Sequence, residues 1–245
     1  MFLFFVTPIL SLYTFFLGKT YIRSYTKNRD NIKRAQPFEP NQTIILFDLH
    51  GVIFKHNYKK MVQTLWKSSL KWPLFYNLFN PYLLRDIIKL LRHRPIPESF
   101  FVHLANNYKQ FRAAFPLFVQ IANCQIVNRP MISLIKKLKS NGYEIAILSN
   151  IGELIFIDLE SQHHDIFHLF DHIMVCTPET HYISKPNPEI YRRFIKEANP
   201  QNKHIVMIDD KKKNLYGASF FGIIGLQFRN YNRLLKQLNR LGIKL

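Results

Sequence analysis

Short apolar runs that alternate with helical segments constrain the fold of this chain more than any other feature. The runs are nearly continuous and are bounded by Gly, Asn, Asp or Lys, as is typical of strands buried on both faces of a parallel sheet. They are Thr43–Leu49, Glu144–Leu148, Ile173–Cys176, Ile205–Ile208 and Ile223–Phe228. Helical patterns occur between and after them at Met131–Ser140, Leu154–Ser161, Pro188–Ala198 and Asn214–Phe221. This alternation predicts an α/β fold with an open, doubly wound, Rossmann-like parallel sheet.

The stretch from Lys55 to about Asn128 interrupts the alternation. It has no clear strand pattern, and it contains two apolar stripes with helical spacing. We therefore predict a helical insert at residues 55–128, between the first strand and the rest of the sheet. The final segment, Tyr231–Leu241, is amphipathic, and we expect it to pack on the core rather than on a membrane.

Composition and charge limit the class of partner. The 245 residues include 34 Lys and Arg against 16 Asp and Glu, a formal net charge of +18. Hydrophobic residues make up 47% of the chain, so a sizeable core can be buried and intrinsic disorder is not expected. The charge favours phospholipid head groups, nucleic acid or phosphorylated small molecules, with generic basicity as the alternative. Nucleic-acid binding would depend on charge alone, so we do not expect it.

The N-terminal segment carries a second signal. Residues 2–17 are uncharged and mostly Phe, Leu, Ile and Val, and basic residues follow from Lys19 onward. A run of this length is at the lower edge of a membrane span, and the positive-inside rule places the chain after Lys19 in the cytoplasm. We predict a membrane anchor at residues 1–18 and a basic linker at residues 19–42. An atypical signal peptide, or an apolar helix packed on a soluble cytoplasmic domain, is the alternative.

Polar and charged side chains follow the predicted strands, at the positions where an open α/β sheet forms its sites. They are Asp48, His50, Ser149, Asn150, Lys185, Asp209 and Asp210. A single Asp or Ser after a strand is commonly only a helix N-cap. Four loops that each supply such residues, in order and with suitable spacing, predict one shared site.

Four segments that contain these residues resemble, in order, the four motifs of the haloacid dehalogenase-like (HAD) hydrolase superfamily. They are Asp48-Leu49-His50-Gly51-Val52, Leu148-Ser149-Asn150, Lys185-Pro186-Asn187-Pro188-Glu189-Ile190-Tyr191 and Ile208-Asp209-Asp210. The resemblance spans Thr43 to about Phe228, and it is strongest to the branch with a helical cap inserted after the first motif. It implies a HAD-like core at residues 43–54 and 129–245 and a small cap domain at residues 55–128.

The resemblance also implies a magnesium-dependent phosphatase that acts on a small phosphorylated substrate through an aspartyl-phosphate intermediate. Asp48 would be the nucleophile, because a carboxylate can attack phosphorus directly. Negative charge crowds such a site, so a hard cation is needed, and Mg²⁺ prefers a few carboxylates, water and substrate oxygens. Asp48, the backbone carbonyl of His50, and Asp210 would be its ligands, with Asp209 close by.

The remaining motif residues would bind the phosphoryl group. Ser149 through its hydroxyl and Asn150 through its backbone would bind phosphoryl oxygens. Lys185 would offset the negative charge on the nucleophile and on the phosphoryl group in the transition state. All three therefore have roles that depend on an anionic substrate.

His50 is the departure from the family pattern. Phosphatases of this family usually have an aspartate here, which protonates the leaving oxygen and then activates the hydrolytic water. Imidazole is a competent acid–base group near neutral pH, so His50 can take that role. Alternatively, the protein binds phosphate and Mg²⁺ without turnover, or it performs other chemistry, although the pair Asp209-Asp210 argues against a dehalogenase. The sequence leaves the substrate and the oligomeric state open.

Overall fold

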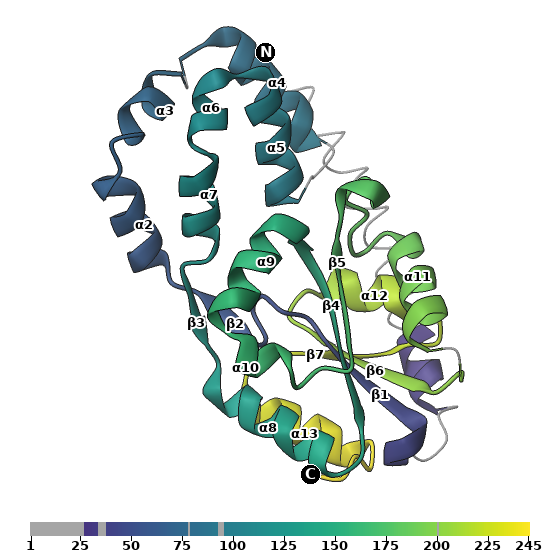
Figure 1. Ribbon diagram of the computed structural model, residues 1–245. Coiled ribbons are helices and arrows are strands. Elements are labelled where there is room, and N and C mark those ends of the chain that lie inside the picture. The colour runs from purple at the N-terminus through teal and green to yellow at the C-terminus, as the bar shows by residue number, and fades with distance from the viewer. Residues whose placement is uncertain (1–26, 34–37, 78, 93–95, 200) are drawn as a thin grey trace, which may run out of the picture. The chain divides into compact units, whose positions relative to one another are not determined.

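The computed structural model describes residues 27–33, 38–77, 79–92, 96–199 and 201–245. Five strands form the central sheet in the order β5-β4-β1-β6-β7 (Figure 1). They are β1 (Thr43–Phe47), β4 (Glu144–Gly152), β5 (His172–Cys176), β6 (His204–Asp209) and β7 (Ile224–Gln227). Strands β4 and β5 pair in parallel, as do β6 and β7. The predicted α/β fold with a parallel central sheet is therefore confirmed.

The helices predicted outside the insert also occur close to where their patterns placed them. They are α8 (Arg129–Ser140), α9 (Glu153–Gln162), α11 (Pro188–Ala198), α12 (Lys212–Ser219) and α13 (Tyr231–Arg240). The short helix α10 (His164–Phe167) and the 3₁₀ turns η1 (Pro40–Gln42) and η2 (Pro178–Thr180) were not predicted. Most ends differ from the predictions by only a few residues. The larger difference is β4, which continues past the predicted end at Leu148 to Gly152, where its pairing with β5 resumes after a shift of register.

Local chemistry explains why these elements begin where they do. All five residues of β1 are buried, so this strand shows no polar alternation. Asn187 caps α11 by accepting a hydrogen bond from the backbone N–H of Glu189, and a proline follows it at the first helical position. Asn230 caps α13 in the same way, by accepting from the N–H of Arg233.

A helical insert, residues 58–122, separates two short strands that the sequence analysis missed. Strands β2 (Phe54–His56) and β3 (Gln125–Val127) pair antiparallel at its two ends. Its helices are α2 (Tyr58–Lys67), α3 (Lys71–Asn77), α4 (Pro81–Arg92), α5 (Pro97–Asn107), α6 (Lys109–Ala113) and α7 (Phe115–Ala122). Helix α2 packs against α7, and α5 packs against α6 and α7 (Figure 1). Leu83, Leu104 and Phe111 are buried in the core of this insert.

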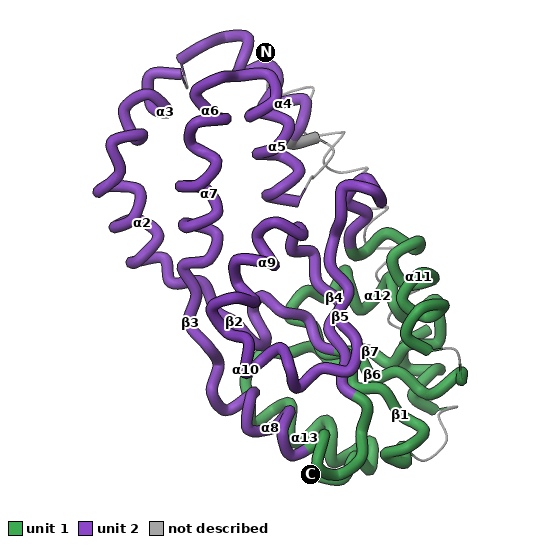
Figure 2. The backbone as a smooth tube through the Cα atoms, viewed as in Figure 1, with its two compact units in different colours: residues 1–46, 138–144, 185–245 green, residues 47–137, 145–184 purple. Residues whose placement is uncertain are grey.

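The chain divides into two compact units (Figure 2). Unit 1 holds the described residues up to Leu46 together with residues 138–144 and 185–245, and unit 2 holds residues 47–137 and 145–184. The helical insert therefore belongs to unit 2, together with β5 and most of β4.

In unit 1, a helical segment at residues 27–33 is bonded to the edge strand β7. The Asn28 side chain accepts a hydrogen bond from the Gly225 N–H (2.8 Å) and donates one to the Gly225 carbonyl (3.2 Å). Asn31 donates to the carbonyl of Ser219 (2.7 Å). Asn28 thus satisfies backbone groups of the edge strand β7, and Asn31 satisfies a carbonyl at the end of α12, although the segment lies in the range predicted as a basic linker.

The predicted membrane anchor has no support from the structure. None of the helices in the described part of the chain has both the length and the apolar character that crossing a bilayer requires. The predicted span, residues 1–18, lies outside the described residues. The anchor thus stays a prediction from the sequence alone.

Candidate active site

Three of the predicted site residues come together as an acidic cluster. Asp48, Asp209 and Asp210 each offer a carboxylate oxygen, and these oxygens lie within 4.8 Å of one another. Asp48 and Asp209 are buried, and Asp210 is partly exposed. Three carboxylates at this spacing repel one another strongly unless a cation is bound between them.

Asp209 is held by a dense set of hydrogen bonds within unit 1. The ammonium group of Lys185 donates to Asp209 Oδ2 at 2.9 Å, and neither side chain of this pair is exposed. The Asn214 side-chain nitrogen lies 3.1 and 2.9 Å from the two Asp209 oxygens, and the Lys211 N–H donates to Oδ1 at 2.7 Å. Both oxygens of Asp209 are therefore occupied by donors, so this carboxylate fixes Lys185 in position.

Asp210 differs from Asp209 although it is the next residue. Its Oδ1 atom is buried and has no hydrogen-bond partner among the described residues. Burial raises the pKa of the Asp210 carboxyl above 3.8, its ordinary value, and the charge of Asp209 adds to this, while Lys211 and Lys185 oppose it. A buried carboxylate oxygen without a donor, next to two other carboxylates, fits a hard cation such as Mg²⁺.

Asp48 lies at the end of β1, where the chain turns sharply. Its Oδ1 accepts from the N–H of Leu49 at 2.9 Å, and the N–H groups of Ile53 and Phe54 both donate to the Leu49 carbonyl. Gly51 has a φ of 86°, which a residue with a side chain rarely adopts, so glycine suits this turn. The turn orients the Asp48 carboxylate at the strand end.

The His50 side chain contacts the strand that leaves the helical insert. Its Nε2 lies 2.9 Å from the side-chain nitrogen of Gln125, which also donates to the carbonyl of Ala122 at 3.0 Å. Which of the two side chains donates in this contact depends on the tautomer of the imidazole ring. The ring also stacks on His56, with centroids 5.2 Å apart. Gln125 was not singled out in the sequence, and no pattern there indicates its role.

Ser149 and Asn150 lie within β4, in the interval where its register with β5 shifts. Ser149 is buried, and its hydroxyl oxygen accepts from the Ile151 N–H at 3.2 Å. Such an irregularity in a strand re-aims side chains and is common next to active sites. Ser149 and Asn150 therefore lie at an irregular part of the strand.

Glu98 is a buried carboxylate that the sequence analysis missed. It comes from α5 and accepts hydrogen bonds from the N–H groups of Leu154 (3.4 Å) and Ile155 (3.1 Å), in the first turn of α9. A Cβ atom on Gly152 would lie 2.1 Å from its Oε2, so this position requires glycine. Burial raises the pKa of the Glu98 carboxyl. The sequence does hold one signal for this residue, because Glu98 is the only acidic residue between Asp86 and Glu144.

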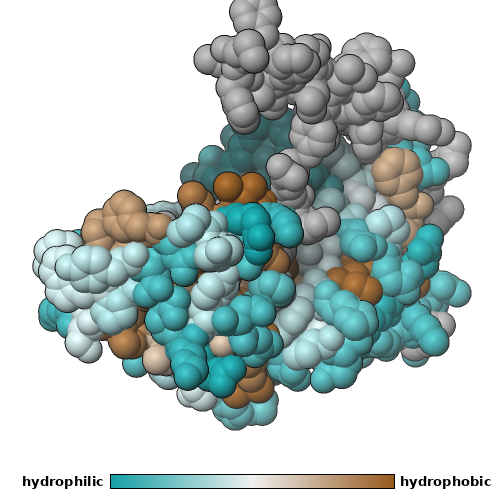
Figure 3. Space-filling view, turned by 90° about the horizontal axis from the view of Figure 1, so that it is seen from above, coloured by the Kyte–Doolittle hydropathy of each residue, from teal (hydrophilic) through white to brown (hydrophobic). Residues whose placement is uncertain are grey.

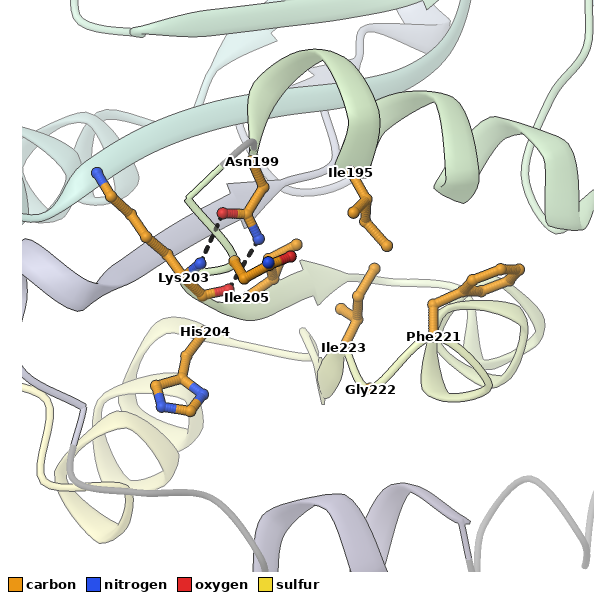
Figure 4. Close-up of a pocket in the computed structure, with 9 residues that line it drawn as sticks. Ile195, Asn199, Lys203, His204, Ile205, Phe221, Gly222 and Ile223 are labelled. Atoms are coloured by element: carbon orange, nitrogen blue, oxygen red, sulfur yellow. Dashed lines mark hydrogen bonds between the residues drawn. The ribbon is translucent and has the colours of Figure 1, made fainter.

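A pocket of about 190 Å³ lies at the beginning of β6, the opposite end of this strand from Asp209 (Figure 4). Its lining includes Asn199, whose side chain accepts from the Lys203 N–H at 2.7 Å and donates to the Lys203 carbonyl at 2.8 Å. None of the predicted site residues lines this pocket. Asn199 therefore closes a turn there, and the acidic cluster remains the candidate active site.

Comparison with known families agrees with the motifs. A family model described as haloacid dehalogenase-like hydrolase matches residues 43–222. The chain belongs to this family of hydrolases. A curated relative, a sesquiterpene phosphatase from Aspergillus oryzae, is 27% identical over 124 residues, which cover 51% of this chain and 62% of the relative. The match thus spans less than two thirds of that protein's length.

Solved structures share the fold. A HAD family enzyme from Bacteroides thetaiotaomicron, as a mutant in complex with magnesium and inorganic phosphate, has a TM-score of 0.56 at 15% identity. The comparison covers 79% of this chain and 98% of that one. An L-2-haloacid dehalogenase from Xanthobacter autotrophicus has a TM-score of 0.51 at 14% identity, over 82% and 84% of the two chains. At these identities, the likeness establishes the fold.

Proposed function

We propose that this protein is a magnesium-dependent phosphatase that hydrolyses a small phosphorylated substrate through an aspartyl-phosphate intermediate on Asp48. The observation that carries the proposal is the acidic cluster, in which Asp210 has a buried oxygen without a donor. Membership of the hydrolase family and the phosphatase relative support the same chemistry. The magnesium–phosphate complex of a protein with the same fold is consistent with it.

In the proposed reaction, a carboxylate oxygen of Asp48 attacks phosphorus and the bond between phosphorus and the ester oxygen breaks. Water then hydrolyses the acyl phosphate, which releases inorganic phosphate and restores Asp48. Bound Mg²⁺ would offset negative charge on the phosphoryl group. Its proposed ligands are Asp48, Asp210 and the His50 backbone carbonyl. Asp209 would lie close to the ion and hold Lys185 in position, because donors already occupy both Asp209 oxygens.

Three further residues are proposed to hold the phosphoryl group. Lys185 would place a buried positive charge beside it, and its ion pair with Asp209 limits the directions in which the ammonium group can point. The Ser149 hydroxyl and the backbone of Asn150 would donate to phosphoryl oxygens. Lys185 and Ser149 are buried, and burial would strengthen their interactions because little water competes for them.

The helical insert is proposed to act as the cap, with the domain boundaries predicted from the sequence: residues 55–128 for the cap, and 43–54 and 129–245 for the core. The phosphatase relative supports only the general class of substrate, a phosphorylated small molecule. The proposed anchor at residues 1–18 would keep this catalytic domain at the cytoplasmic side of a membrane.

Removal of magnesium is the direct test. We expect the purified full-length chain to hydrolyse at least one member of a phosphate-ester panel with Mg²⁺, and to lose about 10²-fold or more of that rate in EDTA. Phosphate release would be measured, and EDTA already saturated with Mg²⁺ is the control. Equal turnover with and without free metal would contradict the proposal.

The alternative is a protein that binds a phosphorylated ligand without turnover, and the position of His50 favours it. The imidazole is hydrogen-bonded to Gln125 and stacked on His56, so its side chain cannot rotate freely. Magnesium-dependent phosphate binding without hydrolysis of any ester would support this alternative. A third possibility is HAD chemistry other than phosphate transfer.

Substitutions at His50 discriminate between these functions. If His50 is the acid–base group, His50→Ala should lower kcat by about 10²- to 10⁴-fold, and His50→Asp should restore much of it. The readout is kcat as a function of pH, and His56→Ala is the matched control because its ring stacks on the same imidazole. An unchanged rate in His50→Ala, with a large gain in His50→Asp alone, would identify a weakened enzyme instead.

A further inference from the structure

We propose that the helical insert docks on the surface of an anionic lipid bilayer. The docking surface, here called the aromatic–basic face, lies on α2, on α3 and on the segment between α3 and α4. It comprises Trp66, Lys67, Lys71, Trp72, Phe75 and Phe79. The inference does not depend on the proposed phosphatase activity or on the predicted anchor.

Large apolar side chains of this face are exposed to an unusual degree. Trp66 is 71% exposed, Phe79 is 74% exposed, and the neighbouring Tyr76 is 69% exposed. Exposed apolar groups of the molecule are visible as brown patches among hydrophilic side chains (Figure 3). Single exposed apolar residues are ordinary, but a contiguous group of this kind marks an interaction surface.

Contacts between the side chains make the face continuous. The Lys71 ammonium group lies 4.9 Å from the ring centroid of Trp66 and 5.8 Å from that of Trp72. The ring centroids of Trp72 and Tyr76 are 6.5 Å apart, those of Tyr76 and Phe75 are 6.3 Å apart, and those of Phe75 and Phe79 are 5.6 Å apart. One lysine, Lys71, therefore lies between the two tryptophans, and the aromatic rings of α3 continue from there. At a bilayer, aromatic rings occupy the interface while lysine stems reach up to the head groups.

The charge of this region selects an anionic partner. No acidic residue occurs between Asp48 and Asp86, whereas six Lys and Arg residues do. Asp86 itself accepts a hydrogen bond from the Tyr108 hydroxyl at 2.8 Å. A second copy of the chain, docked by symmetry on the same face, would bring lysines against lysines. Anionic head groups complement the face in both charge and amphipathic character.

The chain contains its own reporter, because its two tryptophans, Trp66 and Trp72, both lie on the face. We expect the tryptophan emission of the full-length chain to shift to shorter wavelength with vesicles of phosphatidylglycerol and phosphatidylcholine, and not with phosphatidylcholine alone. Lipids brominated in their acyl chains should quench it. This signal reports on the face even if residues 1–18 also bind the vesicles.

Charge reversal gives the matched comparison. Lys59 and Lys60 lie on α2 seven positions before Trp66 and Lys67, and therefore on the same side of that helix. The triple variant Lys59→Glu, Lys60→Glu, Lys67→Glu should raise the lipid concentration that gives the half-maximal emission shift at least about tenfold. The control triple Arg233→Glu, Lys236→Glu, Arg240→Glu on α13 changes net charge equally and should move it by no more than about twofold. Circular dichroism would confirm that both variants fold.

Several outcomes would overturn the proposal. One is the absence of both shift and quenching with anionic vesicles, and another is an equal loss in both triple variants. A shift that depends on protein concentration without lipid would assign the face to a second copy. Acrylamide in solution should quench the tryptophan emission before lipid is added. If it does not, another segment of the chain covers the face.

Discussion

Substituting asparagine for Asp48 is expected to lower kcat for phosphate-ester hydrolysis by at least about 10³-fold, the scale on which removal of a nucleophile acts. The amide cannot form the proposed acyl phosphate, and it also removes one carboxylate from the cluster with Asp209 and Asp210. The measurement is the steady-state rate on the best ester of the panel, with saturating Mg²⁺. Loss of kcat should exceed any change in KM, because the group acts on the reacting bond.

The control for this substitution is Asp165→Asn, which changes an exposed acid of α10 and should leave the rate unchanged. Urea unfolding of both variants would show whether Asp48→Asn is folded. A folded Asp48→Asn protein that turns over as fast as the wild type would exclude Asp48 as the nucleophile. The family membership and the fold would stand unaffected.

Substituting methionine for Lys185 is expected to lower the free energy of unfolding by about 3–5 kcal/mol, because it leaves the buried charge of Asp209 without its cation. This is a large fraction of the stability of a typical domain. The pair is entirely buried, so water cannot replace the lost donor. The measurement is urea or thermal unfolding at neutral pH.

A second substitution separates loss of the ion pair from loss of packing. Adding Asp209→Asn to Lys185→Met should recover part of the lost stability, because the unpaired charge is then removed. Lys244→Met is the matched control, since its ion pair with Glu39 is exposed and should contribute no more than about 1 kcal/mol. If Lys185→Met and Lys244→Met lowered the free energy of unfolding equally, burial would not be the reason why the Lys185 ion pair matters.

The strands of the sheet were predictable because each has a local signature. A strand that is buried on both faces must be apolar at nearly every position, and β1 is buried throughout. The positions of Asp48 and of the pair Asp209-Asp210 follow from the same rule, since parallel strands present their carboxyl ends at one edge of the sheet. In the structure these three carboxylates lie close enough to share an ion, and their roles in a site stay a prediction.

Strands β2 and β3 were not predictable, because each has only three residues and neither shows a period. Their pairing matters for the candidate site, since it brings Gln125 to His50 from 75 positions away along the chain. Glu98 is similar, because it caps α9 through an N–H group 57 positions away. Contacts of this kind leave no periodic trace in the sequence.

The sequence by itself determined the α/β alternation, the helical insert, the hydrolase family and the positions of the candidate acids, because these depend on local patterns of apolar and charged residues. Only the tertiary structure decided how two adjacent aspartates differ. Donors from Lys185, Asn214 and the Lys211 backbone occupy the oxygens of Asp209, whereas one buried oxygen of Asp210 has no donor among the described residues. The physical reason is that hydrogen-bond partners are set by which distant segments fold against each other.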